Sequence, residues 1–597
     1  MGAGFRPFQQ ENWYSGGMLR IAERNFLEKL LLAVCVLTTM AITPKTTADP
    51  INPIKMAIIA IFGFAGIGLI LPNIRKLFSN GYKWVFLSTS LFVLTLATGV
   101  VTSGQNFNQE FFGVYGRNTG FVTYFSLSLL MIVASVVSSR EFITRFLYIF
   151  VVVGLITTIY GYLQYIGIDP AGWTSPYSPI LGFLGNPDFN AAFLGMSVIA
   201  AGGLIFRKSL SIKMKLVFLS YIFLTLFLMK LSVVKQGFFV VAVGLGVFGI
   251  FRLYFSRYRK LAYLSAAVGS ILTTVVLLAL FNLGPLANLL YKSSLTARGY
   301  YWQAGLKMIS ENPLLGVGLD NFGNWYLKYR SQEAYNWAAG QNTNSAHNVF
   351  IDIGANAGLI AFISFILINI FALYTALLVI KRSREFDPLF VTVLSIWVGF
   401  NAQLLISINQ IGVSIWGWIT TGLIIGYNVF QVNFDSKDLE LKTSALHKKI
   451  ASRSSNDMKL LPGSLVLVSV GFFVGACIGL PAYIGEARYF TEMSSGDPIR
   501  IQKAAYIWPK NQQHFMQVGA TLRDNKSNTA IARPELKPET IPDYSHLGIQ
   551  VARDAIKYFP DSIYTYQLLR SFTGITTQED VLTKEKMREL DPFAYGK

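Results

Sequence analysis

Long apolar stretches recur through the first four-fifths of this chain, and they constrain its fold more than any other feature. A helix needs about 20 apolar residues to cross roughly 30 Å of membrane hydrocarbon. Only 14% of the 597 residues are charged, where a soluble domain carries about 25%. We therefore predict an all-α polytopic membrane protein with 12–13 transmembrane helices. The thirteen predicted spans are residues 26–43, 54–72, 84–102, 120–138, 143–167, 189–206, 215–233, 238–254, 261–282, 348–380, 389–408, 411–430 and 464–484.

Lysine and arginine residues predict the direction of the spans, because basic loops stay on the cytoplasmic side of a membrane. If the N-terminus is cytoplasmic, 26 of these residues fall in inside segments and 10 in the outside loops, with the tail 485–597 left out of the count. The alternation holds at every loop. The predicted organisation is a cytoplasmic N-terminal segment (1–25), a membrane domain (26–430) with a large external loop (283–347), a cytoplasmic linker (431–463), an additional transmembrane helix (464–484) and an external helical tail (485–597).

The formal net charge of +19 would suggest nucleic-acid binding if it lay on a soluble domain. Residues 485–597 are nearly neutral, however, with 15 basic against 14 acidic residues. The excess therefore belongs to the membrane part, and no nucleic-acid partner is expected. Cys35 and Cys477 both lie in apolar stretches, so the chain offers neither a disulfide framework nor a zinc site.

The sequence of the tail predicts pairs of helices separated by prolines such as Pro509 and Pro560. The pattern is similar to tetratricopeptide repeats, although fewer than three units are visible. Two interpretations follow: a module that recruits a protein partner, or a helical cap without one.

His347 is the candidate catalytic residue, because it alone among the histidines begins a predicted span on the outer face. Asn344 or Ser345 is expected to cap the following helix, with His347 in its first turn. A neutral imidazole at that place can act as a general base. The alternative is a histidine that only makes local hydrogen bonds at the membrane interface. The other histidines are His447, His514 and His546.

Basic residues on the predicted outer side are candidates for phosphate binding. Arg298 lies near the start of the external loop, where a guanidinium can form a bidentate pair with a phosphate or simply anchor the loop at the interface. Lys235 lies in a very short outer turn, which holds its ammonium at headgroup depth, where it either binds a partner or snorkels. The remaining outward cations before the loop are Lys45, Lys55, Arg117 and Lys230.

The external loop also contains a turn rich in proline and glycine, residues 311–318, and many aromatic residues that suit either a membrane interface or stacking on sugars. The sequence contains no glycine-rich phosphate loop, Asp-x-Asp pair or His-x-x-x-His cluster. An ATPase and a metal-dependent transferase are therefore disfavoured.

One ordered set of residues runs through the external loop and the span after it: Arg298, Trp302, the stretch 311–318, Ala346, His347, Asn348, Gly354 and the stretch 357–360. This set resembles the core of the O-antigen ligase and polymerase family of bacterial envelope proteins. The resemblance covers about 65 residues, and weaker matches occur at residues 112–120 and 182–192.

The resemblance implies a multi-pass enzyme of the bacterial cytoplasmic membrane. Such enzymes transfer a glycan from an undecaprenyl-diphosphate carrier to an acceptor hydroxyl on the outer side, without a metal, nucleotide or other cofactor. By the resemblance His347 activates the acceptor, Arg298 binds the leaving diphosphate, and Lys235 takes the place of a second family arginine. Arg117, in the weaker match at 112–120, is expected to bind the diphosphate as well. The expected partners are the lipid-linked donor, a glycan, lipid or protein acceptor, and membrane lipid.

Elementary chemistry agrees with this assignment. A lipid diphosphate already leaves readily, so an enzyme mainly needs cations near it and a base on the opposite face of the sugar. Single displacement would invert the anomeric centre. Ligation to a lipid core, polymerisation and transfer to protein stay open, and the rival classes are a transporter or lipid-linked glycan flippase and a non-catalytic envelope scaffold.

Overall fold

The structure, a computed structural model, describes residues 19–43, 46–78, 82–173, 175, 178–280, 293–434, 460–532, 534–535, 537–572 and 576–596. These residues form helices and no β-strand, which confirms the all-α class. Most of the predicted N-terminal segment (1–25) and most of the predicted linker (431–463) lie outside the described residues. Lys45 and the first residues of the predicted external loop also lie outside them.

Eight of the described helices are long and apolar enough to cross a membrane, which confirms a polytopic membrane protein. They are α2 (Asn52–Ile70) with its continuation η1 (Leu71–Phe78), α3 (Lys83–Thr102), α6 (Arg140–Tyr165), α7 (Pro187–Ile205), α8 (Ile212–Leu231), α9 (Gln236–Tyr254), α15 (Val349–Arg382) and α19 (Pro462–Met493).

Five further helices occupy the remaining predicted spans, and their crossing of the membrane stays a prediction. Two of them are shorter apolar helices, α5 (Phe121–Val137) and α16 (Pro388–Leu404). The other three are α1 (Ile21–Met40), α10 (Arg259–Leu280) and α17 (Ile411–Phe434). A helix is thus present at each of the thirteen predicted spans.

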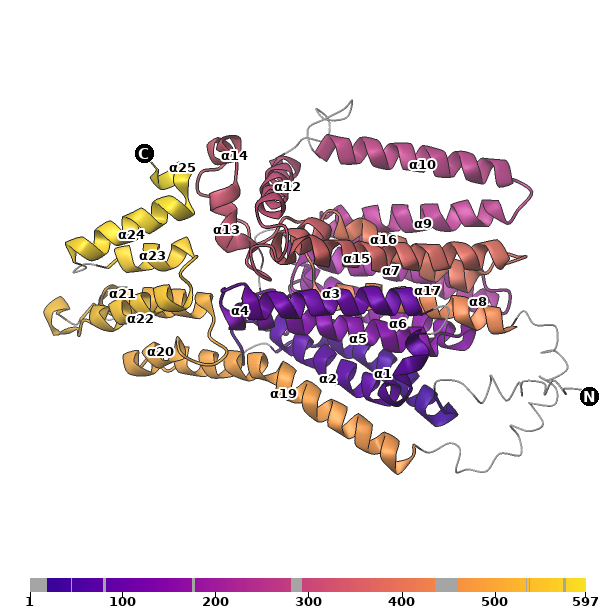
Figure 1. Cartoon of the computed structure of the whole chain (residues 1–597), viewed down its shortest axis with the longest axis horizontal. Helices are drawn as coiled ribbons and strands as arrows, with labels where there is room; N and C mark the ends of the chain where they lie inside the picture. The colour runs from indigo at the N-terminus through magenta and orange to yellow at the C-terminus, as the bar shows by residue number, and fades with distance from the viewer. Residues whose placement is uncertain are drawn as a thin grey trace, which may run out of the picture.

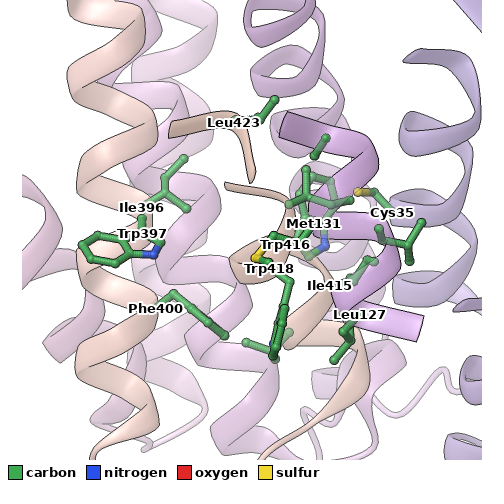
Figure 2. Packing of buried hydrophobic residues seen from close by; sticks show 14 of the residues in the cluster. Cys35, Leu127, Met131, Ile396, Trp397, Phe400, Ile415, Trp416, Trp418 and Leu423 are labelled. Carbon is green, nitrogen blue, oxygen red and sulfur yellow. The ribbon is translucent and has the colours of Figure 1, made fainter. Parts of the chain in front are cut away.

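Aromatic side chains fill the centre of the bundle (Figure 2). Trp416 on α17 is fully buried, and its ring stacks on Phe150 of α6 with 3.8 Å between ring centroids. Its indole N–H donates to the Thr39 hydroxyl of α1 at 2.8 Å, which satisfies the one polar atom of this buried side chain. The contacts join three helices that are far apart in sequence.

Glycines allow α19 to lie directly against α2. Gly471, Gly475 and Gly479 recur every four residues and so share one face of α19. A Cβ atom at Gly475 would lie 2.6 Å from the main-chain oxygen of Ala60 on α2. Small residues of this kind let backbones approach closely, which favours helix association in membranes through van der Waals packing.

The glycine- and proline-rich turn predicted from the sequence packs into a break in α15. Gly358 has φ +80° and ψ 178°, which interrupts the helix. The amide of Leu359 beyond the break donates to the Pro313 carbonyl at 2.8 Å, and the amide of Val317 donates to the Ala355 carbonyl at 2.9 Å. The turn therefore satisfies backbone groups that the break would otherwise leave unpaired.

The remaining helices lie outside the bundle of membrane helices, and the tail helices lie beyond one end of it (Figure 1). Near that end lie α4 (Phe107–Phe112), α12 (Ser293–Glu311), α13 (Phe322–Tyr329) and α14 (Gln332–Trp337). The tail continues α19 with α20 (Pro498–Ala504), α21 (Gln512–Ala532), η4 (Pro538–Thr540), α22 (Ser545–Tyr558), α23 (Ile563–Arg570), α24 (Thr577–Leu590) and α25 (Pro592–Tyr595). The helical character of the tail is confirmed, and its likeness to tetratricopeptide repeats stays a prediction.

The tail shares a hydrophobic core with the loop helices. Met587 and Leu590 of α24 and Ile563 of α23 belong to one buried cluster with Trp302 of α12 and Tyr326 of α13. The segments that carry the resemblance are therefore covered by the tail rather than open on that side.

Candidate active site

His347 lies just before α15, in a backbone conformation that few residues adopt. Its φ is +53°, which costs a residue other than glycine roughly 1–2 kcal/mol. The N-cap of α15 is Asn348, whose side chain accepts from the amides of Phe350 and Ile351 at 3.1 and 3.2 Å. The prediction that His347 sits in the first helical turn is thus wrong, because the cap is Asn348 rather than Asn344 or Ser345 and His347 lies one residue before it.

Hydrogen bonds to Asp352 hold the strained segment in place. One carboxylate oxygen of Asp352 accepts from the Ser345 hydroxyl at 2.5 Å, and the other accepts from the Ala346 amide at 2.7 Å. The Ser345 hydroxyl oxygen in turn accepts from the His347 amide at 3.0 Å. Strained residues persist only when their surroundings fix them, and they concentrate at functional sites.

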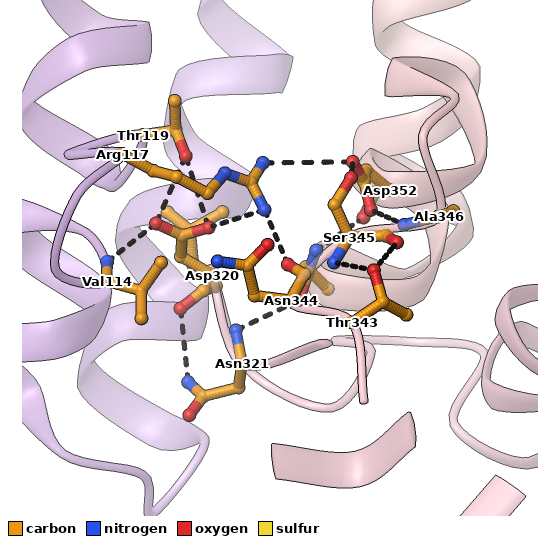
Figure 3. Close-up of polar contacts among 12 residues, drawn as sticks. Val114, Arg117, Thr119, Asp320, Asn321, Thr343, Asn344, Ser345, Ala346 and Asp352 are labelled. Carbon is orange, nitrogen blue, oxygen red and sulfur yellow. Dashed lines mark hydrogen bonds and ion pairs between the residues drawn. The ribbon is translucent and has the colours of Figure 1, made fainter. Parts of the chain in front are cut away.

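Arg117 lies beside the same segment and joins it to a second loop (Figure 3). Its guanidinium nitrogens lie 3.8 Å from carboxylate oxygens of both Asp320 and Asp352, and one donates to the Asn344 carbonyl at 2.5 Å. The Arg117 side chain is 8% exposed. These contacts favour a role in fixing the His347 segment, and the predicted direct binding of diphosphate by Arg117 stays a prediction.

Asp320 is held on its other side by the loop that contains Arg117. Its carboxylate accepts from the Val114 amide at 2.7 Å and from the Thr119 hydroxyl at 3.1 Å. Asp320 and Asn118 also have positive φ values, +57° and +52°. Three strained residues other than glycine, counting His347, therefore lie one in each of three loops that the contacts of Arg117 and Asp320 join.

Glu110 of α4 also contacts the loop that contains Asp320. Its carboxylate accepts from the Leu319 amide at 2.9 Å and from the Ser103 hydroxyl at 2.7 Å. Burial raises the pKa of Glu110 to about 7, and the two hydrogen bonds oppose that rise. The carboxyl group is thus a structural acceptor that fixes the residue preceding Asp320.

Arg298 of α12 is partly buried and lies within electrostatic range of His347. Burial lowers the pKa of Arg298, and the charges of Asp188 on α7 and Tyr301 oppose that effect. The ring of Tyr301, one helical turn after Arg298, lies 5.7 Å from the His347 ring, centroid to centroid. The structure therefore brings together the predicted base and the predicted main phosphate ligand.

The surroundings keep His347 neutral. Burial, the positive charge of Arg298 and the positive charge of Arg117, in that order, lower the pKa of His347 from 6.5 to about 4. The imidazole is therefore unprotonated at physiological pH and able to accept a proton, as a general base must.

Lys235 lies at the start of α9, outside the buried group formed by Arg117, Arg298 and His347. It is the N-cap residue, and its side chain is exposed. Gly237 packs against the start of α7, where a Cβ atom would lie 2.4 Å from the Ala191 carbonyl oxygen. That contact places the Lys235 turn at the same end of the bundle as Asp188, the neighbour of Arg298.

A buried ion pair ties the tail to the predicted external loop. Arg330, just after α13, makes two hydrogen bonds to the Asp591 carboxylate, at 2.7 and 2.8 Å, and the two side chains are 1% and 5% exposed. Another Arg330 nitrogen donates to the Ala339 carbonyl at 2.9 Å. Asn342 donates to the hydroxyl of Tyr564 in the tail at 2.8 Å. The segment that leads to His347 therefore rests on the tail.

Sequence reasoning missed Asp320, Asp352 and Asp591. An acidic residue in the first turn of an apolar span, such as Asp352, is a signal for a partner inside the protein, because a charge in a membrane needs one. Asp320 and Asp591 carried no comparable signal, since each lies in a polar segment. Among the residues that the structure describes, no group of three or more metal-ligating side chains is placed to hold a metal ion.

Comparison with known proteins supports the resemblance. Residues 220–366 match the protein-family model described as O-antigen ligase. None of the curated proteins compared with the chain matches it. The matched segment runs from α8 through the break in α15, and it contains Lys235, Arg298 and His347. Residues 220–366 thus carry a segment similar to O-antigen ligases, which supports the predicted resemblance to the O-antigen ligase and polymerase family.

Proposed function

We propose that this protein transfers a glycan from an undecaprenyl-diphosphate carrier to an acceptor hydroxyl at the outer face of the bacterial cytoplasmic membrane. The family match supports glycan transfer of the O-antigen ligase type in general. The observation that carries the finer proposal is a neutral histidine, His347, beside the partly buried Arg298. The distribution of basic residues supports a cytoplasmic N-terminus and an external tail.

In the proposed reaction His347 accepts the proton of the acceptor hydroxyl while the acceptor oxygen attacks the anomeric carbon of the donor sugar. The bond from that carbon to the diphosphate oxygen breaks, and the diphosphate leaves with the electron pair. Arg298 stabilises the charge that develops on the leaving oxygen. A single displacement of this kind inverts the anomeric centre.

Donor binding would also strengthen the base. Arg298 and Arg117 lower the pKa of His347 because they are positively charged. A bound diphosphate brings negative charge and opposes their effect. The pKa of His347 then rises toward the working pH, where a general base is most effective. The acceptor is therefore activated mainly when the donor is present.

We propose a different role for each of the three basic residues. Arg298 offers a planar guanidinium suited to bidentate contact with a phosphate. Lys235 offers a compact exposed charge at the start of α9, without the bidentate fork of an arginine. Arg117 is proposed to act through its ion pairs with Asp320 and Asp352 by holding the His347 segment.

The test is transfer by the purified protein in membranes with a lipid-linked donor and acceptor. His347→Ala is expected to lower transfer by at least about a hundredfold, in line with typical general-base contributions. His546→Ala, a matched change at an exposed histidine of the tail, is expected to retain activity. A His347→Ala variant as active as His546→Ala would overturn the proposed mechanism.

The role of Lys235 has its own test. Lys235→Ala is expected to raise the KM for the donor, and Lys235→Arg to preserve the charge and most of the activity. Lys230→Ala is the control, because Lys230 is an exposed lysine near the same turn. Equal effects of Lys235→Ala and Lys230→Ala would indicate a general effect of surface charge rather than contact with the diphosphate.

A further inference from the structure

A cavity of about 310 Å³ lies between the external segments and the tail, near the proposed active site but outside it. Three segments line it: residues 104–107, which lead into α4, the start of α13, and residues 557–561, which run from the end of α22 toward α23. Its volume falls within the range of small-molecule sites, which runs from about 300 to 1,000 Å³. The mechanism proposed above leaves this cavity unused.

The chemistry of the lining suits a neutral, polyhydroxylated ligand. Gln105, Asn106, Asn321 and Asn324 contribute carboxamides, which both donate and accept hydrogen bonds. Phe107 adds an aromatic ring that is 51% exposed, so one of its faces is available for stacking. Sugars present this combination of hydroxyl groups and an apolar ring face.

The charges of the cavity do not favour an anion. Asp561 supplies a carboxylate, one oxygen of which accepts from the Gln105 side chain at 3.1 Å. The cation in the lining, Lys557, pairs with Asp554 at 2.8 Å and is 74% exposed. A phosphate would meet one carboxylate and one engaged lysine, whereas a sugar hydroxyl can donate to the carboxylate.

The hydrogen bonds of the lining hold its amides in place. The Asn324 side-chain nitrogen donates to the Asn321 side-chain oxygen at 3.0 Å, and the Gln109 side chain donates to the same oxygen at 2.9 Å. The Asn106 side chain donates to the Tyr558 carbonyl across the cavity at 3.0 Å. The site is therefore built from fixed groups on both sides rather than from mobile surface chains.

The cavity is connected to the proposed active site through Asn321. Asn321 follows Asp320, the partner of Arg117, and its amide donates to the Asn356 side chain on α15 at 3.0 Å. A ligand in the cavity therefore lies against the loop that fixes the His347 segment. The tail supplies the other wall, so the cavity exists only when the tail is docked.

We propose that this cavity binds a saccharide unit of the acceptor. The inference rests on the proposed function, because it assigns an acceptor class to the reaction at His347. It gives the tail a part in acceptor recognition, with residues 557–561 as the tail's contribution to the site.

The test measures saccharide binding and transfer separately. The probe is the oligosaccharide released without lipid from the cell's own surface glycan, titrated against the full-length protein by calorimetry. Asn324→Ala and Phe107→Ala are each expected to weaken binding about 2- to 12-fold, the loss for one hydrogen bond or one aromatic contact. Asn336→Ala, an exposed amide of α14 outside the cavity, is the matched control and is expected to bind normally.

Transfer kinetics give the second readout. Asn324→Ala and Phe107→Ala are expected to raise the KM for the acceptor by the same factors and to leave kcat unchanged. His347→Ala is expected to bind the oligosaccharide like the wild type. If the wild-type protein binds the saccharide but shows no transfer activity, the proposed function is wrong, and the assignment of the saccharide as an acceptor is wrong with it. Failure of the wild type to bind, or binding by Asn324→Ala and Phe107→Ala that equals binding by the control Asn336→Ala, would overturn the cavity proposal itself.

Discussion

Replacement of Asp591 by asparagine would leave Arg330 as an unpaired charge at the junction of the tail and the predicted external loop. Arg330 is 1% exposed and makes both of its carboxylate hydrogen bonds to Asp591. Removal of one partner of a buried ion pair typically costs about 3–5 kcal/mol, because the other charge stays desolvated. Arg330 keeps its bond to the Ala339 carbonyl and its position 4.9 Å from the Tyr335 ring centroid.

Because these contacts remain, we expect Asp591→Asn to destabilise the docked state of the tail by about 3 kcal/mol, the lower end of that range. That corresponds to an increase of roughly 150-fold in the undocked population, since each 1.4 kcal/mol is a factor of ten. Hydrogen exchange of the amides in α13, α14 and residues 339–347 measures this population directly. Faster exchange there should accompany a loss of transfer activity, because the same segment leads to His347.

Two further variants separate the buried charge from other effects. Glu579→Gln removes a pair with Arg553 whose side chains are 24% and 47% exposed, and it should cost at most about 1 kcal/mol. Arg330→Met combined with Asp591→Leu removes both charges and should recover most of the stability. The reasoning is refuted if Asp591→Asn exchanges no faster than Glu579→Gln, or if the double variant is as unstable as the single one.

Three other predictions concern separate parts of the molecule. The pH profile of kcat/KM should fall only as pH drops through about 4, where His347 becomes protonated, and Arg298→Ala should move that midpoint upward because it removes a positive charge. Gly358→Ala should lower the melting temperature, because Gly358 has φ +80° and a Cβ atom there would lie 2.2 Å from a carbonyl oxygen of the Pro–Gly turn. Gly249→Ala, where the added Cβ would meet open space, should leave the melting temperature unchanged. Gly475→Leu should separate α19 from α2, detectable as increased protease sensitivity of the tail.

The membrane helices, and two residues of the candidate site, could be identified from the sequence for local reasons. In lipid each backbone group must be satisfied within its own helix, so a run of apolar residues identifies a span without knowledge of its neighbours. His347 and Arg298 were identifiable because a histidine and an arginine at the ends of apolar stretches are expensive to place and rare.

Other features depended on contacts between distant segments, and only the tertiary structure decided them. Arg117 was predicted as a phosphate ligand from its charge, yet it lies between Asp320 and Asp352, more than 200 residues away in sequence. The tail gave no sign in its sequence that Asp591 would meet Arg330. Whether a charge binds a ligand or stabilises the fold is decided by which opposite charges the packing places beside it, and sequence spacing does not record that.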